Sequence, residues 1–263
     1  MNFLTRILSL LYRVYDVLFG TRWYIIEGNI GCGKTTLIRK LKEDNHLEVI
    51  EEPVEMWKTM VDESGQNILG LFYTNPKRYA YLFQTVVFKT RMMALEHPQE
   101  KLIRFSERSI WTDKHIFSKS CHELGHLNQL EKNTYDIWFK WLEDKITRKP
   151  DGIIYLYAAP ETCLSRVQER DRSEEGGISI DYLKTIHTKH EEWLGNNTEY
   201  EGIPIHIIDN TNDTSFTLGQ VQDITNYNSK YYRIRNRVRD TMADWKNRFI
   251  IWSTQQLVKA KIL

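Results

Sequence analysis

The sequence predicts an α/β fold in which a five-stranded parallel sheet is flanked by helices on both faces. Three observations support this fold class: short apolar runs with the length of buried strands, long stretches of helical periodicity between them, and a glycine-rich loop that joins the first run to a helix. The expected strands are residues 23–26, 48–50, 102–105, 153–157 and 205–208. The clearest expected helices are residues 78–95 and 128–146.

Length and charge restrict the domain organisation. The chain has 263 residues, which suits one large α/β domain. We expect this domain at residues 21–226, between an N-terminal apolar helix at 1–20 and a basic helical extension at 227–263. The 36 Lys and Arg residues balance the 35 Asp and Glu residues, for a net charge of +1. This balance argues against a nucleic-acid-binding protein, because such proteins carry a clear positive excess.

The two ends of the chain differ in character from the domain between them. Residues 3–19 are apolar at helical spacing, but Arg6, Arg13 and Asp16 interrupt them, so the run is too short and too charged for a good membrane span. We favour a helix docked on the domain or on a second subunit, with membrane contact or organelle targeting as the alternatives. Residues 229–263 carry nine Lys and Arg against two Asp, and we expect one or two basic helices with a solvated face, with contact with an acidic partner or a membrane surface as the alternative.

The cysteines indicate the redox compartment. Cys32, Cys121 and Cys163 are scattered along the chain, odd in number and without metal-ligand spacing. This pattern is typical of a reduced intracellular compartment, and we expect the cytoplasm, with the mitochondrion as the alternative.

The glycine-rich loop fits the phosphate-binding pattern G-x-x-x-x-G-K-[ST], with the strand before it and the helix after it that the pattern requires. Its glycines let successive backbone N–H groups point at phosphate oxygens, and the helix N-terminus adds a favourable dipole. Lys34 can reach the transferred phosphate, and the Thr35 hydroxyl can ligate Mg²⁺. The motif predicts a P-loop NTPase fold that binds ATP through Gly28, Asn29, Ile30, Gly31, Cys32, Gly33, Lys34, Thr35 and Thr36.

Charged side chains follow the second and third expected strands, at the sheet edge where parallel sheets bind ligands. Glu52 is a candidate general base that accepts a proton from a substrate hydroxyl. Glu107 is a candidate Mg²⁺ ligand and Arg108 a candidate clamp for a substrate or phosphate oxygen, with a structural ion pair as the alternative. Three arginines before a polar, glycine-bearing segment favour a lid over a polyphosphate, with a solvated helix face as the alternative: Arg166, Arg170 and Arg172.

Five segments carry a family resemblance. They are IEGNIGCGKTT, EEPVEMW, NILGLFYTNPKRYAYLFQT, ERSIWTDKHIF and DGIIYLYAAPETCLSRVQERDRSEEGGISIDYLKTIHTKHEEWL, in this order. Together they resemble the deoxyribonucleoside kinase family, which includes deoxycytidine, deoxyguanosine and mitochondrial thymidine kinases. The resemblance covers roughly residues 22–225 and is far more specific than the phosphate loop alone.

The resemblance implies a reaction in DNA precursor salvage: transfer of the γ-phosphoryl group of ATP–Mg²⁺ to the 5′-hydroxyl of a deoxyribonucleoside. It implies that Glu52 is the general base, with Arg108 near the same hydroxyl. It places Mg²⁺ beside Thr35 and Glu107, and the lid arginines over the donor phosphates.

For the nucleoside, the resemblance implies a slot of aromatic walls with one amide at the edge of the base. Gln84 matches that amide, and Tyr73 with Glu175 matches the pair that holds the sugar 3′-hydroxyl. The walls match Ile30, Trp57, Phe83 and Phe117. A flat base suits aromatic faces and a bidentate amide.

The choice of base depends on two further matches. Arg91 lies two helical turns after Gln84, on the same expected face, and matches an arginine that faces the base in deoxycytidine and deoxyguanosine kinases. Asp113 matches its acidic partner. The pair leaves less room for a thymine methyl group, which favours deoxycytidine or a deoxypurine. Val87 departs from the small residue of deoxycytidine kinases and keeps a thymidine-preferring or broad-specificity enzyme open.

Other interpretations stay open at this point. A nucleoside monophosphate kinase of the thymidylate type shares the phosphate loop, but it would need a second anion site. A non-catalytic structural relative is a third interpretation, although Lys34, Glu52 and Arg108 are all intact. Family members are usually dimers, so we expect a homodimer to which residues 78–95 and 128–146 contribute.

Overall fold

The computed structural model describes most of the expected domain and little of the two chain ends. The described residues are 20–146, 148–211, 214–227, 232–238, 240, 241 and 244. The expected helix at 1–20 and most of the basic extension therefore lie outside them. Contacts divide the chain into one unit, Arg22–Val221, and a second made of Met1–Thr21 with Gln222–Leu263. The domain limits of 21–226 stay a prediction.

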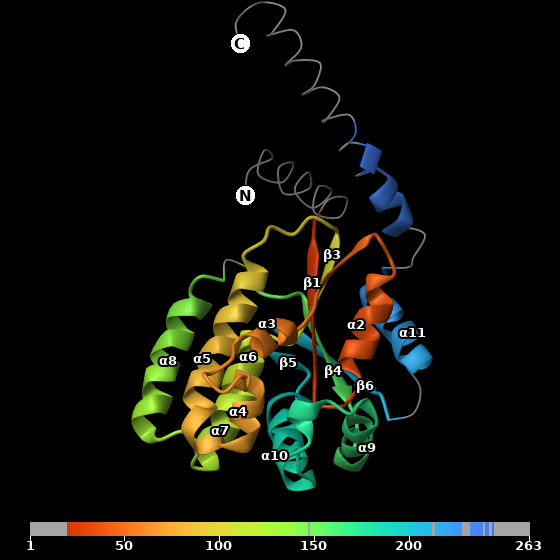
Figure 1. Ribbon diagram of the computed structural model, residues 1–263. Helices are drawn as coiled ribbons and strands as arrows, with labels where there is room; N and C mark the ends of the chain where they lie inside the picture. Colours follow the sequence, from red (N-terminus) through yellow and green to blue (C-terminus); the bar gives the residue numbers. More distant parts are fainter. Residues whose placement is uncertain are drawn as a thin grey trace, which may run out of the picture. The chain divides into compact units, whose positions relative to one another are not determined.

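A mostly parallel sheet runs through the unit Arg22–Val221 (Figure 1). Its strand order is β2-β3-β1-β4-β6-β5, and only β5 is antiparallel to its neighbour. The strands are β1 Arg22–Gly28, β2 Leu47–Ile50, β3 Ile103–Glu107, β4 Gly152–Tyr157, β5 Glu199–Tyr200 and β6 Ile203–Asp209. All five expected strands are confirmed. The predicted number of strands was wrong by one, because the two polar residues of β5 have no periodicity that could reveal them.

Helices cover both sides of the sheet, with α2 on one side and α5, α6 and α8 on the other (Figure 1). The α-helices are α2 Lys34–Lys42, α3 Val54–Thr59, α4 Ile68–Thr74, α5 Pro76–Leu95, α6 Ile110–Thr112, α7 Lys119–Glu123, α8 Gln129–Glu143, α9 Pro160–Arg170, α10 Ile180–His190 and α11 Thr214–Thr225. The remaining turns are the π-helices η1 Asp113–Ser118 and η3 Glu191–Gly195 and the 3₁₀ turn η2 Ser173–Glu175.

Polar caps fix where the two long helices begin. Asn75 caps α5 through Arg78 N, and Pro76 supplies a first residue with a helical φ. Asn128 and Glu131 form a capping box at the start of α8. Both expected helices are therefore confirmed, and each begins within two residues of the predicted position.

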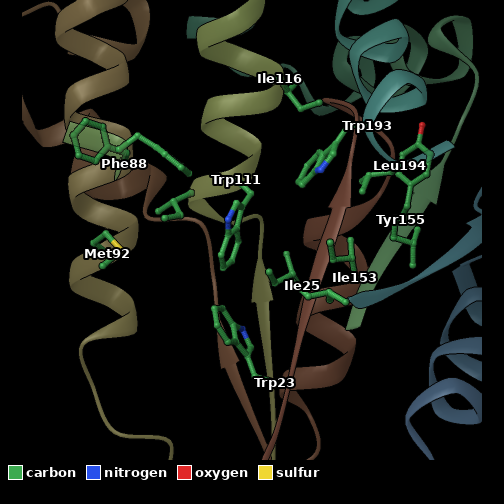
Figure 2. Packing of buried hydrophobic residues seen from close by; sticks show 14 of the residues in the cluster. Trp23, Ile25, Phe88, Met92, Trp111, Ile116, Ile153, Tyr155, Trp193 and Leu194 are labelled. Atoms are coloured by element: carbon green, nitrogen blue, oxygen red, sulfur yellow. The ribbon is translucent and has the colours of Figure 1, made fainter. Parts of the chain in front are cut away.

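The main core lies between the sheet and the helices of one side. Trp23, Ile25 and Ile153 project from β1 and β4 toward Trp111 of α6 and Trp193 of η3 (Figure 2). The ring centroids of Trp23 and Trp111 are 6.4 Å apart. Aromatic side chains bury large apolar areas, so this cluster supports the strands whose ends carry the charged residues.

Within the described residues, we find no helix with the length and apolar character that crossing a membrane requires. The N-terminal segment, for which membrane contact was one interpretation, lies outside this part of the chain.

Candidate active site

A cavity of about 590 Å³ opens at the carboxyl ends of the parallel strands. The phosphate loop forms one side and the aromatic residues of α3, α4 and α5 form the other. Nineteen of the predicted site residues line it: Ile30, Gly31, Gly33, Lys34, Thr35, Thr36, Glu52, Trp57, Tyr73, Phe83, Gln84, Arg91, Glu107, Arg108, Phe117, Arg166, Arg170, Arg172 and Glu175. Four do not: Gly28, Asn29, Cys32 and Asp113.

The phosphate loop between β1 and α2 depends on glycine at a position with left-handed backbone. Gly31 has a φ of 80°, and a Cβ atom there would meet the Cys163 carbonyl oxygen at 2.4 Å. Lys34 is buried, and its ammonium donates to the carbonyl oxygens of Gly28 (3.0 Å) and Asn29 (2.7 Å). Burial lowers the pKa of Lys34, with Arg108 adding to the effect. The two hydrogen bonds hold the amine against the phosphate loop.

The residues that do not line the cavity have supporting positions. Asn29 donates to the Leu183 carbonyl oxygen at 2.9 Å, which ties the loop to α10. Cys32 is fully buried, and Gly28 ends β1 with a φ of 145°. These three residues support the phosphate loop without lining the cavity.

Two oxygen donors lie side by side at the start of α2. Thr35 Oγ1 donates to Glu107 Oε1 at 2.7 Å, which joins the phosphate loop to the end of β3. A hydroxyl and a carboxylate are the ligand types that Mg²⁺ prefers, and Mg²⁺ in phosphoryl-transfer sites needs only one or two protein ligands because phosphate and water complete its shell. The chemistry of these two residues therefore fits the metal.

Glu52 lies between two guanidinium groups. Its Oε1 accepts from Arg91 Nη2 at 2.5 Å, and Arg108 Nε is 3.4 Å from the same oxygen. Burial alone would raise the pKa of Glu52, but Arg91 and Arg108 outweigh it and hold that pKa at about 2. Glu52 is therefore ionised throughout the physiological range.

Arg91 is shared between Glu52 and Asp113. Its Nε is 3.0 Å from Asp113 Oδ2, and its Nη1 donates to the Glu107 carbonyl oxygen at 3.3 Å. Asp113 is fully buried behind Arg91. The expected Arg–Asp contact is confirmed, although only Arg91 of the pair reaches the cavity. The contact between Arg91 and Glu52 was missed, because sequence spacing alone does not relate α5 to the end of β2.

Arg108 directly follows β3 in a left-handed backbone conformation, with a φ of 64°. Its backbone N–H donates to the Ile26 carbonyl oxygen at 2.9 Å, and its guanidinium lies 4.9 Å from the centre of the Phe117 ring. A cation over an aromatic face is attracted by the ring. These contacts aim Arg108 at the cavity and at Glu52.

Aromatic rings form the far wall of the cavity. Phe83 stacks on Phe72 with centroids 4.8 Å apart and meets Trp57 edge-on at 5.5 Å. Trp57 is fixed by a hydrogen bond from its Nε1 to Thr90 Oγ1 at 3.0 Å. Gln84 is buried beside them, and its Oε1 has no hydrogen-bond partner among the described residues. A flat ligand with a hydrogen-bonding edge suits this wall.

The three lid arginines divide into two groups. Arg166 is tied to the carbonyl oxygens of Asn210 (3.0 Å) and Thr211 (2.9 Å). Arg170 and Arg172 both contact Glu175, Arg172 at 3.2 Å. Tyr73 lies nearby, and burial together with the Glu175 charge raises the pKa of its hydroxyl. The polar segment after α9 contains the 3₁₀ turn η2, and Glu175 is buried within it.

The cavity also contains residues that the sequence reasoning did not identify: Arg39, Val54, Leu69, Phe72, Glu169, Tyr182 and Asn210. Asn210 is the most informative. It follows β6, and its Nδ2 donates to the Cys32 carbonyl oxygen at 2.6 Å, so it joins the last strand to the phosphate loop. A polar residue at the carboxyl end of a parallel strand was the available signal, the one that had identified Glu52.

A phosphate loop, an adjacent hydroxyl–carboxylate pair and a slot with a hydrogen-bonding wall define a P-loop phosphotransferase with room for a flat acceptor. The model of the deoxynucleoside kinase family matches residues 24–233. The chain belongs to this family, and it is an ATP-dependent deoxynucleoside kinase. A monophosphate kinase and a non-catalytic relative are thereby set aside.

Relatives support the same family. The chain is 39% identical to a probable deoxycytidine kinase of fowlpox virus (strain NVSL), over 75% of this chain and 86% of the relative. It is 38% identical to deoxycytidine kinase 2 of Gallus gallus, over 72% and 82%. It is 33% identical to the mitochondrial deoxyguanosine kinase of Xenopus laevis, over 83% and 88%.

Proposed function

We propose that this kinase phosphorylates the 5′-hydroxyl of deoxycytidine or a deoxypurine nucleoside. The observation that carries the proposal is Arg91, which lines the same cavity as Gln84 and pairs with buried Asp113. A fixed guanidinium offers donors to a ring nitrogen or carbonyl group of the base and takes up space that a thymine methyl group would need. Relatives named as deoxycytidine and deoxyguanosine kinases are in accord with this preference.

A thymidine-preferring or broad-specificity enzyme is the alternative. Val87 lies one turn after Gln84 and lines the cavity next to Arg91. Its size at this point changes the room for substituents on the base, so it supports the alternative as much as Arg91 supports the main proposal.

For the transfer itself, we propose that Glu52 orients the 5′-hydroxyl and accepts its proton. Phosphoryl transfer passes through a loose transition state in which the hydroxyl needs little activation, so a carboxylate with a pKa of about 2 can serve mainly by orientation and accept the proton late. Lys34 and Arg108 neutralise charge that develops on the transferred group. Arg166, Arg170 and Arg172 cover the donor phosphates.

Thr35 and Glu107 would hold Mg²⁺, which neutralises phosphate charge when bound. Tyr73 and Glu175 would hold the sugar 3′-hydroxyl. Since Arg170 and Arg172 contact Glu175, this carboxylate connects the proposed sugar site with the lid.

We also propose a homodimer that forms through α5 and α8, which lie side by side (Figure 1). On α8, Leu130 and Ile137 are 74% and 72% exposed, and Trp141 lies one turn further along the same face. Exposed apolar side chains at this spacing are typical of a subunit contact. For the compartment we propose the cytoplasm, in accord with three unpaired cysteines, with the mitochondrion as the alternative.

A panel assay tests the base preference. The enzyme, ATP and Mg²⁺ are incubated with each of the four natural deoxyribonucleosides, and kcat/KM is measured for each. We expect the highest value for deoxycytidine or a deoxypurine nucleoside. The highest value for thymidine would favour the alternative, and no transfer to any nucleoside would contradict the proposal.

A further inference from the structure

Glu27 is a fully buried carboxylate near the end of β1, one residue before the phosphate loop. Its Oε1 accepts hydrogen bonds from Ser109 Oγ, at 2.9 Å, and from Thr112 Oγ1. Its Oε2 has no hydrogen-bond partner among the described residues. A buried carboxylate is costly unless its surroundings compensate it, so its presence beside the active site calls for a physical explanation.

The two hydroxyl groups that contact Glu27 form the capping box of α6. Ser109 N donates to Thr112 Oγ1 at 3.0 Å, and Thr112 N donates to Ser109 Oγ at 3.4 Å. A capping box satisfies the first backbone groups of a helix without any help from a third residue. The contacts from Glu27 therefore add a link between β1 and the turn that follows β3.

That turn contains Arg108. Its left-handed backbone, with a φ of 64°, is unfavourable for a residue with a side chain and persists only where neighbouring contacts impose it. Two hydrogen bonds to β1 provide such contacts. Arg108 N donates to the Ile26 carbonyl oxygen at 2.9 Å, and the hydroxyl of the next residue, Ser109, donates to Glu27. Adjacent residues of β1 thus hold adjacent residues of the turn.

The Arg108 side chain is buried, and two contacts hold its guanidinium. Its guanidinium lies over Phe117, and its Nε is 3.4 Å from Glu52 Oε1. Its Nη1 has no hydrogen-bond partner among the described residues. The backbone at the turn sets where this side chain starts, and these two contacts hold its guanidinium in the cavity.

We propose that Glu27 is a positioning residue for catalysis: by holding Ser109 and Thr112, it fixes the turn that aims Arg108 at the reacting groups. This inference rests on the proposed role of Arg108 in the transfer. Burial raises the pKa of Glu27, and the role requires only that its Oε1 accept hydrogen bonds from the two hydroxyl groups.

The test measures kcat and both KM values for Glu27→Ala, Glu27→Gln and Thr112→Val. We expect Glu27→Ala and Thr112→Val to lower kcat about tenfold while KM for ATP changes less than about twofold, because the lost interaction acts in the transition state. Glu27→Gln should recover most of the activity, since its carbonyl oxygen can accept from the same two hydroxyls. Thr112→Val preserves side-chain shape, so it remains informative if Glu27→Ala fails to fold.

Glu143→Ala is the matched control. Glu143 accepts a hydrogen bond from Trp111 Nε1 at 2.8 Å, so it holds the residue next to Thr112 on the same short helix but has no contact with the Arg108 turn. Its kcat should be unchanged. An equal loss in this variant would indicate general destabilisation of α6 and would overturn the inference.

A double-variant cycle with Arg108→Lys separates the inference from the proposed function. If Glu27 acts through Arg108, Glu27→Ala should lower kcat less than about twofold in the Arg108→Lys background. If the kcat losses of the two single variants multiply in the double variant, the proposed role of Glu27 is overturned, while that of Arg108 stands. An Arg108→Lys variant with unchanged kcat would instead overturn the proposed role of Arg108, and the inference with it.

Discussion

At the scale of single residues, the arrangement around Glu52 determines the state of the proposed base. Two unit charges about 4 Å apart attract each other by about 4 kcal/mol at an effective dielectric constant of 20, and the two arginines together outweigh the effect of burial on the pKa of Glu52. Arg91 and Arg108 both lie closer than this to Glu52 Oε1. The result is a carboxylate that stays ionised under all ordinary conditions and whose basicity depends on Arg91.

The pH dependence of the reaction tests this arrangement. In the native enzyme, the pKa of Glu52 is about 2, so kcat/KM should show no loss from protonation of Glu52 above roughly pH 4. The double variant Arg91→Gln and Asp113→Asn removes the cation that pairs with Glu52. Because Asp113 is replaced as well, no buried carboxylate loses its partner at that position. Loss of a cation raises the pKa of a carboxyl group, so the acid limb should move upward to about pH 4 or above.

Arg78→Ala is the control for this experiment. Arg78 lies on α5, as Arg91 does, but it is exposed and its guanidinium packs on the Tyr79 ring. Its pH profile should match that of the native enzyme. An acid limb that stays in place in the Arg91 and Asp113 double variant would contradict the account of Glu52.

At the scale of elements, the phosphate loop illustrates how strand, turn and helix constrain one another. Gly31→Ala should lower stability by about 1–3 kcal/mol and weaken ATP binding, because a side chain is strained at this φ and its Cβ atom would meet the Cys163 carbonyl oxygen. Thermal denaturation and ATP titration measure both effects. Gly219→Ala, in α11 and with open space around its Cβ position, is the control and should be neutral or stabilising.

The link between the lid and the sugar site gives a second prediction at this scale. Glu175→Gln keeps the shape of the side chain but removes the charge that Arg170 and Arg172 contact. We expect KM for the nucleoside to rise about tenfold, because the proposed bond to the 3′-hydroxyl weakens. Glu174→Gln is the control, since Glu174 contacts Asn67 outside this cluster and should leave KM unchanged. Equal KM values in both variants would contradict the role of Glu175.

The elements also indicate how far sequence reasoning could reach. Motifs with a fixed backbone geometry, such as the phosphate loop, could be predicted because their spacing implies their structure. Charged residues after β2 and β3 could be predicted because parallel strands end at one edge. The contact of Arg91 with Glu52 and the buried carboxylate of Glu27 depend on how distant elements pack, and no local pattern of the chain contains that information.

At the scale of the whole molecule, the exposed apolar face of α8 is the main feature that the unit Arg22–Val221 leaves unexplained. The double variant Ile137→Glu and Trp141→Glu places charge in the centre of this face. We expect it to convert a dimer into a monomer, as measured by light scattering after gel filtration, because charges are not tolerated in the core of a subunit contact. Val61→Glu, at an exposed apolar residue elsewhere, should stay dimeric. A native enzyme that is monomeric would contradict the proposal.

The most direct test of the account as a whole is phosphoryl transfer by Glu52→Gln. Gln keeps the size of the side chain but cannot accept the proton, so kcat should fall by about 10²–10⁴-fold while the dissociation constant for ATP stays within about twofold. Glu51→Gln is the matched control. The Glu51 carboxylate is next to Glu52 in the sequence, but it pairs with Lys42 and does not line the cavity, so kcat of this variant should be unchanged. Unchanged transfer by Glu52→Gln would contradict the proposal that this cavity phosphorylates a nucleoside hydroxyl through Glu52.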